Sequence, residues 1–117
     1  MKIKRLREHE QTPVTMDGAQ GARMRMLIGP TEGAKVFHMR HFEIAPGGHT
    51  PHHRHDYEHE ILILRGAGLV KSESGEHPCR DGDVIWMPPN ELHQFRSVGT
   101  DPLEFICLIP APQNCTA

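Results

Sequence analysis

The sequence lacks a long apolar run and a strong charge of either sign, and each absence excludes a class of protein. No stretch approaches the ~18 consecutive apolar residues that a membrane span requires. The basic start at residues 2–7 is not followed by the apolar segment of a secretory signal. The formal net charge is −2, which does not favour nucleic acid or an anionic membrane as a partner. We therefore expect no nucleic-acid partner, no membrane partner and a cytoplasmic location.

Thiolate pairs are also missing. The three cysteines, Cys79, Cys107 and Cys115, are widely spaced and form no Cys-x-x-Cys motif. This pattern favours neither a disulfide framework nor a thiolate zinc site. Reduced thiols are the expected state, which also agrees with the cytoplasm.

The 117 residues are enough for one domain, and the chain has no internal repeat, no interdomain linker and no sustained helical periodicity. Glycine and proline recur at short intervals, and the segments between them are strand-sized. In the last such segment Leu103, Phe105, Cys107 and Ile109 share a face opposite Glu104. These features predict an all-β sandwich or barrel.

The expected single domain has three parts. The core barrel spans about residues 20–110, an N-terminal arm spans residues 1–12 and can be an edge strand, and a loosely held tail spans residues 111–117. The continuous apolar run at residues 61–64 predicts a strand that is covered on both sides.

Histidine is the outlying residue type. The chain has ten histidines, and five of them lie between His49 and His59. On a strand, side chains two residues apart point to the same side, so His53 and His55 would project together, and His59 keeps the same parity. His93 follows the turn at residues 88–90 and is the best candidate for a fourth ligand. Clustered imidazoles of this kind predict a divalent metal site.

The same residues resemble the two motifs of the cupin family. The first motif has Gly, five residues, His-x-His, three or four residues, Glu, six residues and Gly, and it is matched by Gly47, His53, His55 and Gly66. The second has Gly, five residues, Pro-x-Gly, two residues, His, three residues and Asn, and it is matched by Gly82, Pro88 and His93. The motifs and their flanking strands cover roughly residues 34–109.

Three positions depart from the cupin pattern. His59 stands at the position of the glutamate, Asn90 replaces the turn glycine, and Ser97 replaces the final asparagine. Asn90 is tolerable because asparagine accepts a left-handed backbone better than other side chains except glycine. Glu58 or Glu60 remains an alternative to His59 as a metal ligand.

The resemblance is to small single-domain cupins with four-histidine manganese sites. It implies a double-stranded β-helix, that is, a jelly-roll barrel, that holds one divalent metal per chain on His53, His55, His59 and His93. Manganese is the first expectation and iron the second, while zinc, nickel and copper also suit imidazole ligands. A homodimer with a small-molecule substrate is expected from this architecture.

The favoured function is that of a metal-dependent oxidoreductase of the dioxygenase type, acting on a small apolar or phenolic substrate. The expected apolar pocket is lined by Ile63, Phe95, Phe105 and Ile109. Arg40, His38 and Cys107 share interior parity and are the candidate catalytic residues. Two alternatives remain open. One is a non-catalytic protein that binds or senses a small ligand, and the other is a metal-assisted isomerase with a base among Asp56, Tyr57 and Glu58.

Overall fold

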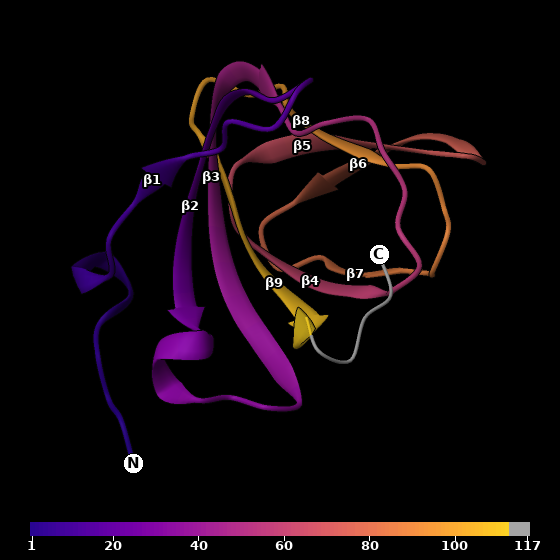
Figure 1. Ribbon diagram of the computed structural model, residues 1–117. Helices are drawn as coiled ribbons and strands as arrows, with labels where there is room; N and C mark the ends of the chain where they lie inside the picture. Colours follow the sequence, from indigo (N-terminus) through magenta and orange to yellow (C-terminus); the bar gives the residue numbers. More distant parts are fainter. Residues whose placement is uncertain (113–117) are drawn as a thin grey trace.

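The computed structural model describes residues 1–112, and its regular structure is almost entirely β (Figure 1). The described residues contain two short 3-10 turns and no α-helix. The turns are η1 (Leu6–Glu8) and η2 (Pro30–Glu32). The strands are β1 (Thr12–Pro13), β2 (Gln20–Ile28), β3 (Phe37–His49), β4 (His59–Arg65), β5 (Ala67–Ser72), β6 (Gly75–Arg80), β7 (Val84–Met87), β8 (Gln94–Ser97) and β9 (Leu103–Pro110). This architecture confirms the predicted all-β cupin fold.

All nine strands belong to one antiparallel sheet that curls on itself. Its order is β6-β5-β8-β3-β9-β4-β7, and β2 pairs with the other edge of β3 while β1 pairs with β2. Figure 1 shows β5, β6 and β8 at the upper right of the curl, β4 and β7 at the lower right, and β2, β3 and β9 together at the left. The strand β3 belongs to both sides, because its first part pairs with β9 and its last residue, His49, pairs with Arg96 of β8.

Two motif positions show why the chain can turn so tightly. Gly66 has a φ of 97°, and a Cβ there would lie 2.5 Å from the carbonyl oxygen of Pro102, so this turn requires glycine. Asn90 has a φ of 67° and is the one non-glycine residue with a positive φ in the described part of the chain. The prediction that Asn90 adopts a left-handed backbone is confirmed.

The core fills the inside of the curl. Its central side chains are fully buried and come from β3, β4, β8 and β9: Ile44, Ile61, Ile63, Phe95, Leu103, Phe105 and Cys107. The prediction that β4 is covered on both sides is wrong, because Leu62 and Leu64 are 42% and 40% exposed on its outer face. Trp86 on β7, paired with Glu60 of β4, is also exposed. The apolar run therefore reflects strand propensity on the outer face as well as burial on the inner one.

The N-terminal arm is fixed against the barrel at two places. Thr12 and Pro13 of β1 pair with Met24 and Arg23 of β2, at the edge of the sheet. Before β1, the Nη2 group of Arg7 donates a hydrogen bond of 2.7 Å to Oε1 of Glu104, a carboxylate on the outer face of β9. The arm thus contributes an edge strand, as expected for part of residues 1–12, and extends across the outside of the sheet.

Ala111, the first residue of the predicted loose tail, is held against the barrel. Ala111 is fully buried, and its backbone N–H donates a 3.0 Å hydrogen bond to the carbonyl oxygen of Val36. Residues 113–117, including Cys115, lie outside the described residues. Among residues 1–112 no helix is long and apolar enough to cross a membrane.

Candidate metal centre

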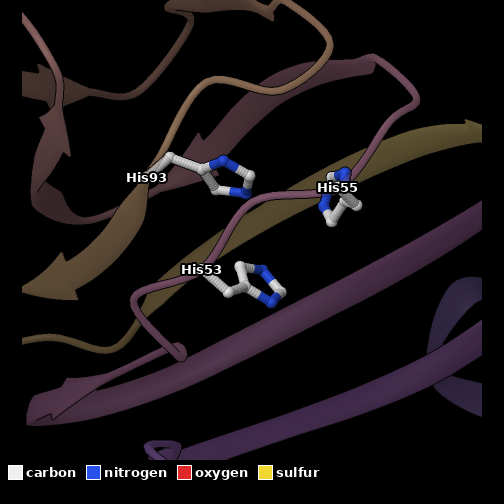
Figure 2. Close-up of side chains that lie close together, drawn as sticks. All are labelled: His53, His55 and His93. Atoms are coloured by element: carbon white, nitrogen blue, oxygen red, sulfur yellow. The ribbon is translucent and has the colours of Figure 1, made fainter. Parts of the chain in front are cut away.

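Three histidines meet at one end of the curled sheet. His53 and His55 lie in the loop of residues 50–58 that joins β3 to β4, and His93 immediately precedes β8. The two chain segments touch through reciprocal backbone hydrogen bonds between His53 and His93, of 3.0 and 2.9 Å. Figure 2 shows the three rings gathered at this point.

The sequence prediction placed His53 and His55 on a strand, and this detail is wrong. Apart from the isolated bridge of His53 to His93, the loop of residues 50–58 has no strand pairing. The side chains converge because the loop is fastened to His93 at His53 and to the turn at Asn90, whose N–H donates 2.7 Å to the carbonyl oxygen of His55. His93 and Asn90, from the segment of the second cupin motif, thus position His53 and His55 of the first motif.

The ring nitrogens of the three histidines are close enough for one cation. One nitrogen from each of His53, His55 and His93 lies within 4.8 Å of the others. The Nδ1 group of His55 donates 3.1 Å to the carbonyl oxygen of Tyr57, and the Nδ1 group of His93 donates 2.8 Å to that of Glu91. Since a carbonyl can only accept, these bonds fix the tautomers and leave both Nε2 atoms unprotonated.

His59 stands beside this group at the start of β4. Its Nε2 lies 2.7 Å from Nε2 of His55, and its Nδ1 lies 3.0 Å from Sγ of Cys107. The rings of Tyr57, His55 and His59 form a near-parallel stack, with 4.1 and 4.3 Å between successive centroids. His59 therefore belongs to the same constellation, although the mutual approach within 4.8 Å involves only the other three histidines.

The environment keeps these imidazoles neutral. Burial, aided by the neighbouring His93, lowers the pKa of His53 to about 4. Burial and the Arg40 charge lower the pKa of His59 to about 2. Burial also lowers the pKa of His55 and of His93. A metal needs neutral imidazole ligands, so the group is prepared for a cation at physiological pH.

These observations fit a divalent transition metal. Imidazole suits zinc, copper, iron and nickel, and backbone carbonyls that orient the ligand rings are the usual second partners of metal-bound histidine. The alternative in which Glu58 or Glu60 replaces His59 as a ligand is not favoured. Both glutamates line a separate depression with Val36 and are absent from the lining of the cavity next to the histidines.

A cavity of about 410 Å³ opens beside the histidines, which is within the usual range for a small-molecule site. The sides are formed by the barrel interior, the histidine loop and the N-terminal arm: Thr12, Pro13, Val14, Thr15, Met16, Met24, Arg40, Phe42, Thr50, Pro51, His53, His55, Tyr57, His59, His93, Phe95, Phe105 and Cys107. The structure thus brings the four predicted ligands into one cavity with Arg40, Cys107, Phe95 and Phe105.

Three residues expected in this pocket lie outside it. His38 is buried at the far end of β3, where its Nε2 donates 3.1 Å to the carbonyl oxygen of Ala34. Ile63 is buried in the core below the cavity, because β4 runs away from the metal end after His59. Ile109 lies opposite His38 and borders the separate depression. The two-residue alternation correctly predicted which face of the strand these residues occupy. It did not predict how far along the strand they lie from the cavity.

Several lining residues were not predicted. Residues 12–16, which comprise β1 and the three residues after it, form one wall with Met24 of β2. Phe42 of β3 and Thr50, the residue after β3, also line the cavity. No motif marks them. The sequence offered a clue for Phe42 alone, because it lies two residues from Arg40 and therefore on the same face of the strand.

Known proteins with similar sequences and structures agree with this geometry. The family model of the cupin domain matches residues 40–109. The chain is 32% identical over 76 residues to 1-methylthio-D-xylulose 5-phosphate methylsulfurylase of Rhodospirillum rubrum, which covers 65% of this chain and 49% of that protein. It is 26% identical over 110 residues to the oxalate-binding protein of Thermotoga maritima, covering 89% and 91% of the two chains.

Among solved structures, the polyketide cyclase RemF from Streptomyces resistomycificus superposes with a TM-score of 0.89 at 29% identity, over 94% of this chain and 79% of that one. The chain spans about half of the length of the methylsulfurylase. The family match covers more than half of the chain and contains all four histidines of the site. The protein is therefore a member of the cupin family.

Proposed function

We propose that the protein is a metal-dependent enzyme that transforms a small molecule beside a divalent metal held by His53, His55, His59 and His93. One observation carries the proposal: neutral imidazoles with oriented Nε2 atoms converge on a cavity that can hold a small molecule. Manganese is our first choice for the metal and iron the second.

A bound divalent metal would supply Lewis acidity toward a substrate oxygen, and a redox-active one would also supply dioxygen chemistry. The chain's own groups would provide the rest of the site. Neutral imidazoles add no negative charge, so they leave the positive charge of the centre undiminished. Phe42, Phe95 and Phe105 would exclude water from an apolar substrate, since their rings lie in contact at centroid distances of 5.2 and 4.8 Å.

The first candidate reaction is of the dioxygenase type, on a small apolar or phenolic substrate. Its support is the combination of histidine ligands with the phenyl-lined cavity. The second candidate is a metal-assisted reaction without dioxygen, such as an isomerisation or a cyclisation. Tyr57 favours it, because a phenol that lines the cavity beside His55 can hold or release a proton. The name of one structural neighbour, a polyketide cyclase, agrees with this second candidate.

The test begins with elemental analysis of untagged protein purified without chelators. About one manganese or iron per chain supports the proposal, and protein that neither contains nor takes up a metal refutes it. Phenolic substrates are then offered to the metal-loaded protein with and without dioxygen. Turnover that consumes dioxygen supports the first candidate, and turnover without dioxygen supports the second. Ligand-induced thermal stabilisation with no turnover under either condition would indicate a binding protein instead.

A further inference from the structure

The cavity contains one permanent positive charge and no negative one. Among its lining residues in the described chain, none is an aspartate or a glutamate, and Arg40 is the one side chain that is charged at every physiological pH. A divalent metal would add to this excess.

The guanidinium of Arg40 is not neutralised by the protein. Its Nη2 group donates 3.3 Å to the uncharged Sγ of Cys107, and no ion pair to a carboxylate forms within residues 1–112. Its Nε atom is buried and has no hydrogen-bond partner in the described part of the chain. A buried donor without a partner is costly unless a ligand satisfies it, and a charged donor favours an anion.

The side chains next to Arg40 indicate what the uncharged part of the ligand would be. The guanidinium carbon lies 4.9 Å from the ring centre of Phe42, which continues through Phe105 to Phe95 as a row of phenyl rings. Cys107 contacts both Arg40 and His59, so one thiol links the guanidinium to a candidate metal ligand. A flat apolar body would pack on the phenyl row while its charged end faces Arg40.

We propose that Arg40 selects the substrate, and that the substrate is a small organic anion, such as a carboxylate, with a flat apolar body. This inference rests on the proposed small-molecule site and adds the charge of its ligand. A single guanidinium, with no second cation in the lining outside the imidazoles, suits a monoanion better than a phosphate ester.

Benzoate and benzyl alcohol form a matched pair of probes that differ mainly in charge. Binding is followed by NMR titration of the protein loaded with zinc, which is diamagnetic, and of the metal-free protein. We expect benzoate to bind at least tenfold more tightly than benzyl alcohol in both forms. Arg40→Met should weaken benzoate about 10- to 100-fold and leave benzyl alcohol nearly unchanged, which corresponds to one charge-assisted hydrogen-bonded contact. Arg40→Lys should restore part of the preference.

Arg96→Met is the control, because it removes an exposed cation of β8 that does not line the cavity and leaves Arg40 in place; it should keep the preference for benzoate. Equal weakening of both probes by Arg40→Met would assign Arg40 a packing role and overturn the inference. So would binding of benzoate to the zinc form alone with no effect of Arg40→Met, because the metal would then be the anion site. The metal-free titration separates this inference from the proposed reaction, which fails instead if metal uptake or turnover is absent.

Discussion

Glu104 offers a quantitative test of how the N-terminal arm is attached to the barrel. Its carboxylate is 1% exposed and accepts hydrogen bonds from Arg7 at 2.7 Å and from His41 at 2.9 Å, while Nε of Arg65 lies 3.0 Å from its second oxygen. Burial opposes ionisation, but the bonds from Arg7 and His41 outweigh it and hold the pKa of Glu104 below its usual value. Glu104→Gln keeps the shape and removes the charge.

The expected cost is worked from these contacts. A Gln amide directed at Arg65 or His41 leaves a buried N–H group without an acceptor, which costs about 1–3 kcal/mol. The weakened bond to Arg7 adds about 1 kcal/mol at most, because Arg7 and Arg65 are more than half exposed and solvent screens their charges. We expect a loss of about 1–4 kcal/mol, or a decrease of about 0.5–2 M in the urea midpoint.

The assay is urea unfolding followed by fluorescence, with limited trypsin digestion as a second measurement. Glu43→Gln is the matched control, because Glu43 lies 3.6 Å from the same Arg7 but is partly exposed, and it should cost less than about 1 kcal/mol. Glu104→Gln should also accelerate cleavage at the basic residues of the arm, since Arg7 loses its anchor. A cost below about 0.5 kcal/mol, or an equal cost for both variants, would refute this account of the arm.

Three further predictions concern the metal site. His59→Ala should lower the metal content measured by elemental analysis, whereas His52→Ala, at an exposed position, should not; unchanged content in both variants would remove His59 from the site. Metal-free protein should lose stability as the pH falls below about 6.5, because the unfolded chain takes up protons there while His53, with a pKa of about 4, and His59, with a pKa of about 2, stay neutral in the fold. Thermal unfolding against pH measures this, and His53→Gln should reduce the slope between about pH 6.5 and 4. Chelation should lower the melting temperature without unfolding the barrel at 25 °C, with a loss of about 2.7 kcal/mol relative to protein at a free metal concentration of 100 Kd; circular dichroism that collapses on chelation would contradict it.

Local spacing predicted much of this protein. The resemblance to the two cupin motifs predicted the fold and the left-handed turn at Asn90. It also led us to expect the four clustered histidines, with His59 in place of the motif's glutamate. The same reasoning misplaced His53 and His55 on a strand. Side chains two residues apart can also converge in a loop when contacts with a distant segment fix its backbone, as the bonds between His53 and His93 do here.

The sequence did not predict which surface residues are buried by segments distant in the chain. Alternation put Glu104 on the outer face of β9, which suggests an exposed carboxylate, but the arm and Arg65 bury it against His41. The parity of Ile109 was likewise insufficient to show how far it lies from the cavity. The metal identity, the homodimer and the cytoplasmic location stay predictions.

The wall built by residues 12–16 and Met24 has a consequence for how this site can diverge. These residues precede the segment that matches the cupin family, residues 40–109, whereas the histidines and Arg40 lie within it. The candidate metal ligands and one wall of the cavity are therefore encoded in separate stretches of the chain. Substitutions at residues 12–16 or Met24 would change the cavity without altering any of the four candidate ligands. For the experimenter, a truncation that removes residues 12–16 would remove part of the cavity lining.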